Sequence, residues 1–298
     1  MMKRNVMISC LVCSLWTSLA IAAETHKNSA DKGVTSVTGI TAEQIIERNI
    51  NARGGAAAWH KINSISMMGK LDAGRQRVDG GRIVTATAPK SRAEKKAELR
   101  KVAMQMNEES SDKIIRLPFQ MELKRPLKSR IEVPFQGDKA VQVYDGAQGW
   151  KLRPYLGRRE VEPFSPLEEK IAAQQQELDG PLINYAAKGT KVSLLGTEQV
   201  NGHKTYKLKL SLKNGDVRNL WIDAQSYLDV KMDGVPRKLD GKLHQVATYF
   251  NNYRKVDGVK IPFELATNIE GVNGSEKINI EHVVVNPKLD DTRFTKPI

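Results

Sequence analysis

Cysteine is nearly absent from this sequence of 298 residues. The two that occur, Cys10 and Cys13, both lie in an apolar segment close to the N-terminus. If that segment is a cleaved signal, the chain that remains has no disulfide, no thiol nucleophile and no thiolate to bind a metal. Residues Met7 to Cys10 resemble a lipidation motif only faintly, because too little apolar sequence precedes them, so we do not expect a lipid anchor.

The apolar segment has the three parts of a secretory signal peptide in their usual order. Lys3 and Arg4 provide the charged start, Val6 to Leu19 the apolar run, and Ala20 to Ala22 the small residues of a cleavage site. The run is shorter than the ~20 residues that span a membrane, and polar sequence follows it directly, so a retained anchor is the weaker alternative. We therefore expect residues 1–23 to be removed and the protein to reside in the periplasm.

Recognisable catalytic motifs are also missing. The histidines do not stand at metal-ligand spacing from one another; they are His26, His60, His203, His244 and His282. The sequence contains no Gly-x-Ser-x-Gly elbow, no phosphate-binding loop and no zinc-protease motif. The acidic pair near the C-terminus, Asp290-Asp291, is better explained by turn capping or solvation than by acid–base catalysis. The sequence thus predicts a protein that is not an enzyme and uses no metal or cofactor.

Aromatic residues are few, at 6%, whereas 47 basic side chains outnumber 34 acidic ones and give a formal charge of +13. A groove for single-stranded nucleic acid combines cations with aromatic stacking platforms. Here the lysines and arginines alternate along strands or gather on one helix, with few aromatic residues between them. The charge therefore favours an anionic membrane surface or an anionic ligand, and does not favour a nucleic acid.

What the chain does contain is alternation of apolar and polar residues with a period of two, which is typical of strands with one buried face. In residues 205–213 the apolar positions are Tyr206, Leu208, Leu210 and Leu212. Asn201-Gly202 precedes this run and Asn214-Gly215 follows it. Asn-Gly favours a type I′ hairpin turn, in which both central residues need positive φ. With Val192–Val200 before it and Val217–Asp223 after it, the run predicts a three-stranded antiparallel meander.

The rest of the chain repeats this pattern. Six Asp-Gly and three Asn-Gly pairs, most of them between strand-like runs, favour a meandering antiparallel sheet over parallel βαβ units. Further strands are expected at Ser64–Asp72, Arg82–Ala86, Phe119–Leu123, Ile131–Phe135, Val141–Val143, Trp150–Leu152, Leu243–Phe250, Val259–Thr267 and Lys277–Val285. We therefore expect a flexible lead at residues 24–39 and then one mainly β (α+β) domain at residues 40–298.

The first predicted helix begins at a capping box formed by Thr41 and Gln44. Its buried stripe is expected to comprise Ile45, Ile46 and Ile50. Gly54-Gly55 provides the stop signal, because glycine is the usual residue just past a helix end. A short helical turn over Ala56 to Ile62 then carries Trp59.

Two more helices are predicted. The first, Ser91 to Asn107, lies in an insertion at about residues 88–112 and is strongly basic with a narrow apolar stripe. Such a helix can lie on a membrane surface, although the narrow stripe favours a solvated helix with a thin docking face. The second, Ser165 to Leu178, begins with the N-cap Ser165 and its box partner Glu168. Its thin apolar face predicts a movable lid, formed by Leu167, Ile171 and Leu178.

One face of the predicted sheet carries more large apolar side chains than two or three thin helices can cover. A hydrophobic cavity beneath the helices is one outcome, and a core filled by side chains is the other; the pattern does not decide between them. The residues expected on the cavity wall are Phe119, Met121, Ile131, Val133, Val143, Trp150, Leu152, Tyr206, Leu208 and Leu210. Trp221 is a further wall residue, although its neighbours Leu220 and Ile222 on the opposite face are apolar too.

Several stretches resemble the outer-membrane lipoprotein-sorting proteins, which are bacterial relatives of the LolA and LolB lipoprotein carriers. These stretches are NARGGAAAWHKINSI (Asn51–Ile65), VQVYDGAQGWKLRPYLG (Val141–Gly157), LDGPLINYAAKGTKVSLLG (Leu178–Gly196), YKLKLSLKNGDVRNLWIDAQSYLDVK (Tyr206–Lys231) and NPKLDDTRF (Asn286–Phe294). Together they extend over nearly the whole chain after the signal. They mark structural turns, and no catalytic residue is carried over from the family.

The resemblance implies a large, unclosed antiparallel β-barrel whose hydrophobic cavity is covered by short lid helices. It also implies a periplasmic carrier or binding protein for lipid, lipoprotein acyl chains or a similar apolar ligand. An alternative of a different class is an envelope signalling or scaffold module that uses the same fold to bind a protein partner. Lipid that copurifies with the protein would favour the carrier, and capture of a protein partner by lipid-free protein would favour the module.

Overall fold

The computed structural model describes residues 39–76, 113–175, 178–239 and 241–298. Its largest element is an antiparallel sheet of thirteen strands in the order β6-β5-β4-β3-β2-β1-β15-β14-β13-β10-β9-β8-β7, and β11 and β12 form a separate two-stranded sheet. The expected signal peptide, the lead up to residue 38, the strand at Arg82–Ala86 and the basic helix at Ser91–Asn107 lie outside the described residues.

The first half of the large sheet consists of β1 (Ser64–Gln76), β2 (Lys113–Lys124), β3 (Lys128–Phe135), β4 (Asp138–Tyr144), β5 (Gly149–Arg153) and β6 (Arg158–Pro163). The second half consists of β7 (Lys191–Val200), β8 (His203–Ser211), β9 (Val217–Asp223), β10 (Asp229–Asp233), β13 (Val246–Val256), β14 (Val259–Ile269) and β15 (Glu276–Val285). The small hairpin is β11 (Arg237–Leu239) and β12 (Lys242–His244). The helical elements are α2 (Ala42–Ala52), α3 (Ala56–His60), η1 (Pro154–Leu156), α5 (Pro166–Gln175) and η2 (Asp291–Phe294).

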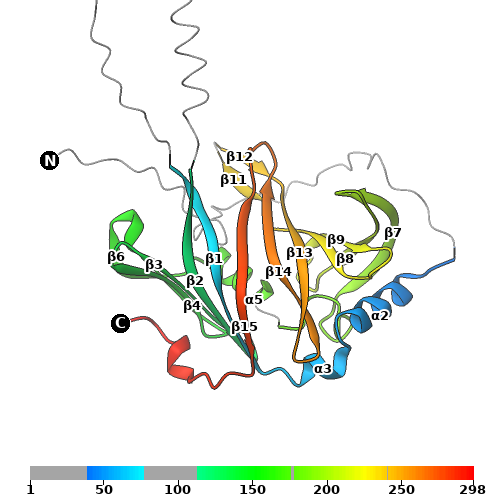
Figure 1. The fold of residues 1–298 in the computed structure, drawn as a ribbon, viewed down its shortest axis with the longest axis horizontal. Helices are drawn as coiled ribbons and strands as arrows, with labels where there is room; N and C mark the ends of the chain where they lie inside the picture. Colours follow the sequence, from blue (N-terminus) through cyan, green and yellow to red (C-terminus); the bar gives the residue numbers. More distant parts are fainter. Residues whose placement is uncertain (1–38, 77–112, 176–177, 240) are drawn as a thin grey trace, which may run out of the picture.

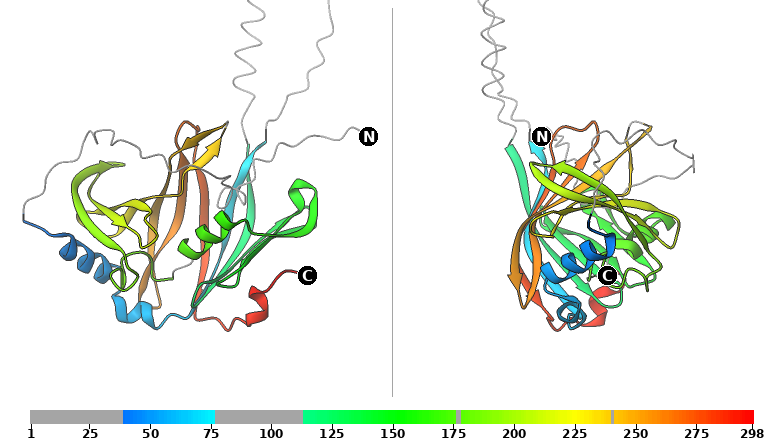
Figure 2. Two further views of the ribbon diagram at one scale, coloured as in Figure 1. Left: turned by 180° about the vertical axis from the view of Figure 1, so that it is seen from behind. Right: turned by 90° about the vertical axis from the view of Figure 1, so that its right-hand side faces the viewer.

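The two halves meet in the middle of the sheet, where β1 pairs with β15 and Ile65 lies opposite Val285. From this seam the strands run outward to β6 at one edge and to β7 at the other. The sheet is curved, and α5, which connects these two edges along the chain, lies across the concave side (Figures 1 and 2). The prediction of an unclosed antiparallel half-barrel with short helices is therefore confirmed.

The central meander of β7, β8 and β9 is confirmed, and its two turns differ. At Asn201-Gly202 both residues have positive φ, 49° and 82°, as a type I′ turn requires. At the second turn only Gly215 has positive φ. Strand β8 ends at Ser211 and β9 begins at Val217, so the loop between them is longer than a two-residue turn. Within it, Asp216 donates its backbone N–H to the Asn214 side chain. The prediction of a type I′ turn at Asn214-Gly215 was therefore wrong, because side-chain capping stabilises a longer loop there.

Helix α2 begins at the predicted capping box. The Thr41 hydroxyl accepts from the Gln44 backbone N–H, and the Gln44 side chain accepts from the Thr41 backbone N–H. Ile45 and Ile46 are buried, and they belong to a core cluster that contains the β8 and β9 residues Leu208, Leu210, Leu220 and Ile222. α2 therefore covers the concave face of the strands next to the β7 edge.

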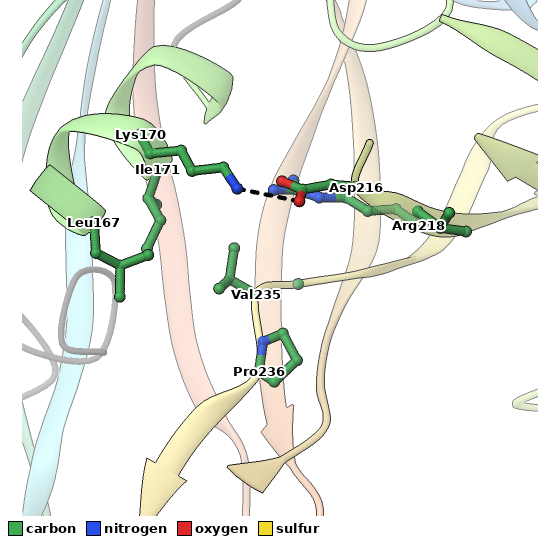
Figure 3. A pocket seen from close by; sticks show the side chains of 9 residues that line it. Leu167, Lys170, Ile171, Asp216, Arg218, Val235 and Pro236 are labelled. Carbon is green, nitrogen blue, oxygen red and sulfur yellow. Dashed lines mark hydrogen bonds and ion pairs between the residues drawn. The ribbon is translucent and has the colours of Figure 1, made fainter. Parts of the chain in front are cut away.

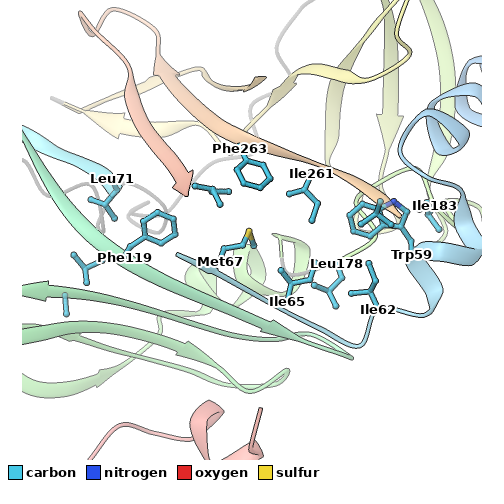
Figure 4. Packing of buried hydrophobic residues seen from close by; sticks show 14 of the residues in the cluster. Trp59, Ile62, Ile65, Met67, Leu71, Phe119, Leu178, Ile183, Ile261 and Phe263 are labelled. Atoms are coloured by element: carbon cyan, nitrogen blue, oxygen red, sulfur yellow. The ribbon is translucent and has the colours of Figure 1, made fainter. Parts of the chain in front are cut away.

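A second core cluster fills the middle of the half-barrel between β1, β2, β14 and β15 (Figure 4). Its members include Met67, Phe119 and Phe263, all of them buried. At one end, Trp59 of α3 and Ile183 close the cluster. Packed side chains, and not a void, therefore occupy this part of the interior.

The opposite face of β4 and β5 is covered by the C-terminal segment. Phe294 of η2 is fully buried against Val141 and Val143, and Trp150 and Leu152 pack against the same cluster. The expectation that Val143, Trp150 and Leu152 face the interior is therefore corrected. These residues do share one face of their strands, as the alternation predicts. That face is the outer one, and it is apolar because the C-terminal segment covers it.

Some boundaries also differ from expectation. Strands β6, β10, β11 and β12 were not foreseen, because each is short and lacks regular alternation. The strand expected over Leu243–Phe250 is split in the structure. Leu243 belongs to β12, and β13 begins at Val246. Helix α5 is described over Pro166–Gln175, and Leu178, the last residue expected in it, lies in a turn.

Candidate ligand cavity

A cavity of about 540 Å³ lies on the concave side of the second half of the sheet. It is bounded by β8, β9, β10, β13 and β14, by the end of α5 and by the segment at residues 180–190. Its apolar wall consists of Ala173, Pro181, Leu210, Leu212, Leu220, Met232, Phe250, Pro262 and Leu265. Its polar lining consists of Arg53, Gly180, Lys188, Thr190, Lys213, Asn214, Arg218, Asp229, Thr248 and Tyr253. The volume falls in the range of ~300–1,000 Å³ that is usual for small-molecule sites.

Strand register explains why these side chains converge. Leu210 on β8 lies opposite Arg218 on β9, and Phe250 on β13 lies opposite Leu265 on β14. Residues that are directly opposite in an antiparallel pair point to the same face of the sheet. The cavity wall is therefore built from cross-strand pairs, with one cation among the apolar residues.

The deep end of the cavity, at Arg53 and Asp229, is polar. Asp229 accepts a hydrogen bond from the Asn49 side chain at 3.0 Å, and its other carboxylate oxygen lies 3.8 Å from Arg53 Nε. The Tyr253 hydroxyl donates to the Asp229 backbone carbonyl at 3.1 Å. The Arg53 guanidinium lies over the Trp59 ring, 4.7 Å from its centroid. This network fixes the junction between α2, β10 and β13.

Burial dominates the electrostatics at this end. It raises the pKa of Asp229, and the Arg53 charge and the Asn49 hydrogen bond only partly oppose that effect. Burial also raises the pKa of Tyr253 well above its ordinary value, with a further contribution from the Asp229 charge. Tyr253 is therefore a neutral hydrogen-bond donor at physiological pH.

The opposite end of the cavity is cationic. Lys213 and Arg218 line it. The Lys188 ammonium donates to the Gly180 carbonyl at 2.8 Å, and a Cβ atom at Gly180 would stand 2.9 Å from the Arg53 guanidinium, so the Lys188 charge lies toward the Arg53 end. A Cβ atom at Gly189 would stand 3.2 Å from Lys213 Cβ, so the glycine allows the Lys213 side chain to lie along the loop. Arg218 is buried, which lowers its pKa, whereas the carboxylates of Asp216 and Asp233 act in the opposite direction.

A smaller cavity of about 190 Å³ lies between α5 and the start of β9 (Figure 3). Leu167 and Ile171 line it from the helix, and Val235 lines it from the segment after β10. Lys170 of α5 reaches across to Asp216, with 3.2 Å between Nζ and Oδ1. Arg218 lines both cavities, so it stands at the boundary between the space under α5 and the larger cavity.

The other side of α5 is fixed to β5. The Lys151 ammonium lies 2.5 and 2.6 Å from the two carboxylate oxygens of Glu168, and both side chains are almost fully buried. Glu168 also closes the helix N-terminus, where it accepts from the Ser165 backbone N–H. Ile171 and Ala172 pack in a cluster with Tyr144 and Phe164. Helix α5 is thus anchored at one arm of the sheet and reaches the other through Lys170.

The predicted wall residues divide into four groups. Leu210 lines the cavity. Tyr206 and Leu208 point to the concave side but pack in the cluster under α2. Phe119, Met121, Ile131 and Val133 belong to or pack against the central core. Trp221, like Val143, Trp150 and Leu152, lies on the outer face, where its indole N–H donates to Glu198 and the Lys231 ammonium stands 4.0 Å from the ring centroid.

Sequence reasoning missed the contributions of β13 and β14, namely Phe250, Tyr253 and Leu265. Their strands were expected, but no signal indicated which half of the sheet contains the space. Of the predicted lid residues, Leu167 and Ile171 face the smaller cavity, whereas Leu178 lies beyond the helix in the central core. The cationic end could have been suspected from Lys213 beside the Asn214-Gly215 turn.

Within the described ranges, His, Cys, Asp and Glu side chains do not gather in groups of three or more that could hold a metal ion. A search of the same ranges found no helix with the length and apolar character needed to cross a membrane.

A family model described as an uncharacterized-protein-like family matches residues 184–297. Among curated proteins no sequence matches this chain. Of the solved structures, a DUF1329 family protein from Desulfovibrio piger is similar with a TM-score of 0.51 and 13% identity, over 85% of this chain and 96% of that one.

Two further structures belong to the kinds of protein that the sequence resembles. A LolA superfamily protein from Nitrosomonas europaea matches with a TM-score of 0.49 and 14% identity, over 87% of this chain and 99% of that one. An outer membrane lipoprotein-sorting protein domain from Vibrio parahaemolyticus matches with a TM-score of 0.48 and 14% identity, over 84% and 94%. At such identities the likeness concerns the fold alone, and the D. piger structure carries that argument.

Proposed function

We propose that this chain is a non-catalytic carrier or binding protein for lipid, a lipoprotein acyl chain or a similar apolar ligand, and that it acts in the periplasm. The observation that carries this proposal is the cavity of about 540 Å³, whose wall is mainly apolar and which lies beside a helix that crosses the concave side. Burial of alkyl surface there would supply the binding free energy, at about 0.8 kcal/mol per methylene group. The implied location rests on the signal-like N-terminal segment and on the family resemblance.

Filling the cavity tests this function without burying a charge. Leu265 lines the cavity and is half-buried, so Leu265→Trp should occupy part of the space that a ligand needs. Val284→Trp is the matched control, because Val284 is 46% exposed and its side chain lies outside the core. Uptake of a fluorescent fatty acid should be lost in the first variant and kept in the second, with melting temperatures close to that of the wild type.

The native ligand requires a separate measurement. Native mass spectrometry and lipid extraction of the protein purified from the periplasm should reveal a copurifying lipid. Wild-type protein that carries no lipid, takes up no fatty acid and instead retains an envelope protein would contradict the carrier and support the signalling or scaffold alternative. The intact mass of the same sample should also show removal of the first 22 or 23 residues.

A further inference from the structure

We propose that the outer edge of β7, at Val192 and Leu194, is a docking site for an extended segment of another protein in which acidic and apolar residues alternate. Strand β7 ends the large sheet on one side (Figures 1 and 2), so the segment would be added there as a further strand. This docking does not depend on the carrier function, since the lining of the larger cavity includes no β7 residue.

The two edges of the large sheet are built differently. At the β6 edge Pro163 has no backbone N–H, Arg159 is exposed, and the pairing with β5 is irregular. Such features keep an edge strand from pairing with another chain. Strand β7 has 10 residues, contains no proline and carries one bulge, after Leu194. The part before that bulge, Lys191–Leu194, is therefore an edge to which another strand can pair.

The hydrogen bonds of β8 divide between its two neighbouring strands. At one end of β8 the Leu212 N–H donates to the Asp216 carbonyl. At the other end the Lys204 carbonyl accepts from the Ala224 N–H. Both bonds lie on the β9 side, and residues two apart in an antiparallel strand bond to the same side, so the even-numbered residues of β8 bond to β9. Its odd-numbered residues, Lys209 among them, bond to β7.

The outward-pointing backbone groups of β7 therefore belong to Val192 and Leu194. Ser193 lies opposite Lys209, so Ser193 directs its N–H and C=O toward β8, and its two neighbours direct theirs away from the sheet. Among the described residues no hydrogen bond reaches these outward groups. Unpaired groups on a sheet edge are a template for an added strand, whose main-chain hydrogen bonds supply affinity.

The side chains beside the edge indicate the chemistry of the partner. Val192 and Leu194 are half-buried on the concave side, where they pack against the cluster under α2. Lys191 and Lys209 lie on the opposite face, because Lys191 and Ser193 share that face and Lys209 is the cross-strand neighbour of Ser193. Within the described ranges neither ammonium forms an ion pair. An added strand thus meets apolar side chains on one face and cations on the other, which fits alternating apolar and acidic residues.

A second copy of this chain is a less suitable occupant. Two β7 edges paired with each other would place two Lys191 and two Lys209 side chains on one continuous face of the joined sheet. Like charges on neighbouring strands are destabilising, and the formal charge of +13 makes whole copies repel each other. The same lysines attract an acidic segment.

Synthetic peptides test the edge directly. Three labelled peptides of about eight residues are compared, a usual strand length. The first alternates glutamate with valine, the second alternates lysine with valine, and the third is the glutamate peptide with its backbone amides N-methylated. Fluorescence anisotropy with the full protein gives their affinities. We expect the glutamate peptide to bind about tenfold more tightly than either of the others, because only it offers both the charge and the backbone donors. Added salt should reduce its advantage over the lysine peptide.

Variants locate the binding site. Val192→Pro removes one outward N–H at a position where an edge strand tolerates proline, so the protein should fold and bind the glutamate peptide about tenfold more weakly. Lys191→Glu should weaken binding of the glutamate peptide and strengthen binding of the lysine peptide. Lys204→Glu is the charge-matched control and should change neither, because Lys204 is exposed at the other end of β8, opposite Gln199. If Val192→Pro fails to fold, the N-methylated peptide and the charge variants still decide.

Three results would overturn the proposal. They are equal affinities for the three peptides, unchanged binding by folded Val192→Pro, and equal effects of Lys191→Glu and Lys204→Glu. A wild-type dimer in analytical ultracentrifugation that dissociates in Val192→Pro would assign the edge to a second copy and also overturn it. Fatty-acid uptake, which tests the carrier, should be the same in the wild type and in all these variants, so failure of one proposal is distinguishable from failure of the other.

Discussion

The Lys151 ammonium and the Glu168 carboxylate form a buried ion pair that joins β5 to the helix across the concave side. Lys151 stands on the polar face of β5, which the alternating pattern would place outside, yet this face points to the concave side, where Glu168 of α5 meets it. The pair therefore fixes the start of α5 to one arm of the sheet. It also places Lys170 within reach of Asp216 on the other arm.

Glu168→Gln should destabilise the protein strongly. Glutamine keeps an oxygen that can accept from the Ser165 backbone N–H, but the buried Lys151 loses its counter-charge. Removal of one partner of a buried pair costs about 3–5 kcal/mol. The double variant Lys151→Met/Glu168→Gln should recover much of this loss, because no buried charge remains. Denaturant unfolding of both variants measures the difference, and equal stability of the two would rule out an uncompensated charge as the cause.

Helix α5 should exchange its amide hydrogens faster than the β8–β9 hairpin. The helix has a thin apolar face, and its contact with the β9 arm relies on the exposed pair of Lys170 and Asp216, a type of pair worth about 0–1 kcal/mol. The hairpin contains Leu208 and Leu220 in a buried cluster. Elements with few buried contacts open at lower free energy. Equal protection of helix and hairpin would identify a permanent cover and not a lid.

Charge substitutions should distinguish packed interior from cavity. Val133 is 1% exposed in the central core, so Val133→Asp buries an unpaired carboxylate and costs several kcal/mol, enough to unfold a domain stable by ~5–15 kcal/mol. Leu208→Asp should behave in the same way. Leu265→Asp places its charge in the cavity beside water, and should abolish fatty-acid uptake with a much smaller change in melting temperature. Similar melting temperatures for Val133→Asp and Leu265→Asp would contradict this division.

Local signals in the sequence predicted local structure well. The capping box at Thr41 and Gln44 places the start of α2, and Asn201-Gly202 places a tight hairpin, because each depends on residues a few positions apart. The seam between β1 and β15 pairs Ile65 with Val285, and no neighbouring residue carries that information. The resemblance to known half-barrels, and not the periodicity, therefore supplied the prediction of an unclosed barrel.

The inward face of β5 shows why the candidate site was only partly predicted. Trp150 and Leu152 alternate with Lys151 and Arg153, and a hydrophobic interior would place the first pair inside. In the structure the C-terminal Phe294 covers the side of β5 with the apolar residues, while Glu168 neutralises Lys151 on the concave side. The period of two shows which residues share a face of the strand, but not which face points to the interior. Segments distant in the sequence determine that orientation.

Gly54→Ala should be more damaging than Gly55→Ala. Both glycines have positive φ, 111° and 88°, so an alanine is strained at either position by about 1–3 kcal/mol. A Cβ atom at Gly54 would in addition stand 2.4 Å from the backbone oxygen of Gly258, whereas no atom lies within 4 Å of one at Gly55. The melting temperature of Gly55→Ala reports the cost of backbone strain alone. That of Gly54→Ala reports the same strain together with the clash against Gly258. A lower melting temperature for Gly55→Ala would show that Gly54 does not lie against Gly258 in the turn between β13 and β14.

The last prediction concerns the pH dependence contributed by Asp229. Burial raises the pKa of its carboxyl above the ordinary value of 3.8, so the folded state holds this proton more tightly than the unfolded state does. Below pH 3.8 the carboxyl is protonated in both states, and its favourable contribution to stability is complete. As the pH rises from 3.8 through the higher folded-state pKa, the unfolded state ionises first, and the free energy of unfolding falls.

Asp229→Asn removes this titration. Asparagine keeps an oxygen for the Asn49 hydrogen bond, and Arg53 keeps its bond to the Asp179 carbonyl. The stability of the variant relative to the wild type should therefore rise with pH through the window that begins at 3.8, whatever fixed cost the lost Arg53 pairing adds at every pH. Other carboxyl groups titrate alike in both proteins, so their contributions cancel in the difference. Urea unfolding at a series of pH values gives this difference directly. A difference that stays constant or falls with pH would mean that the Arg53 charge, and not burial, dominates at Asp229.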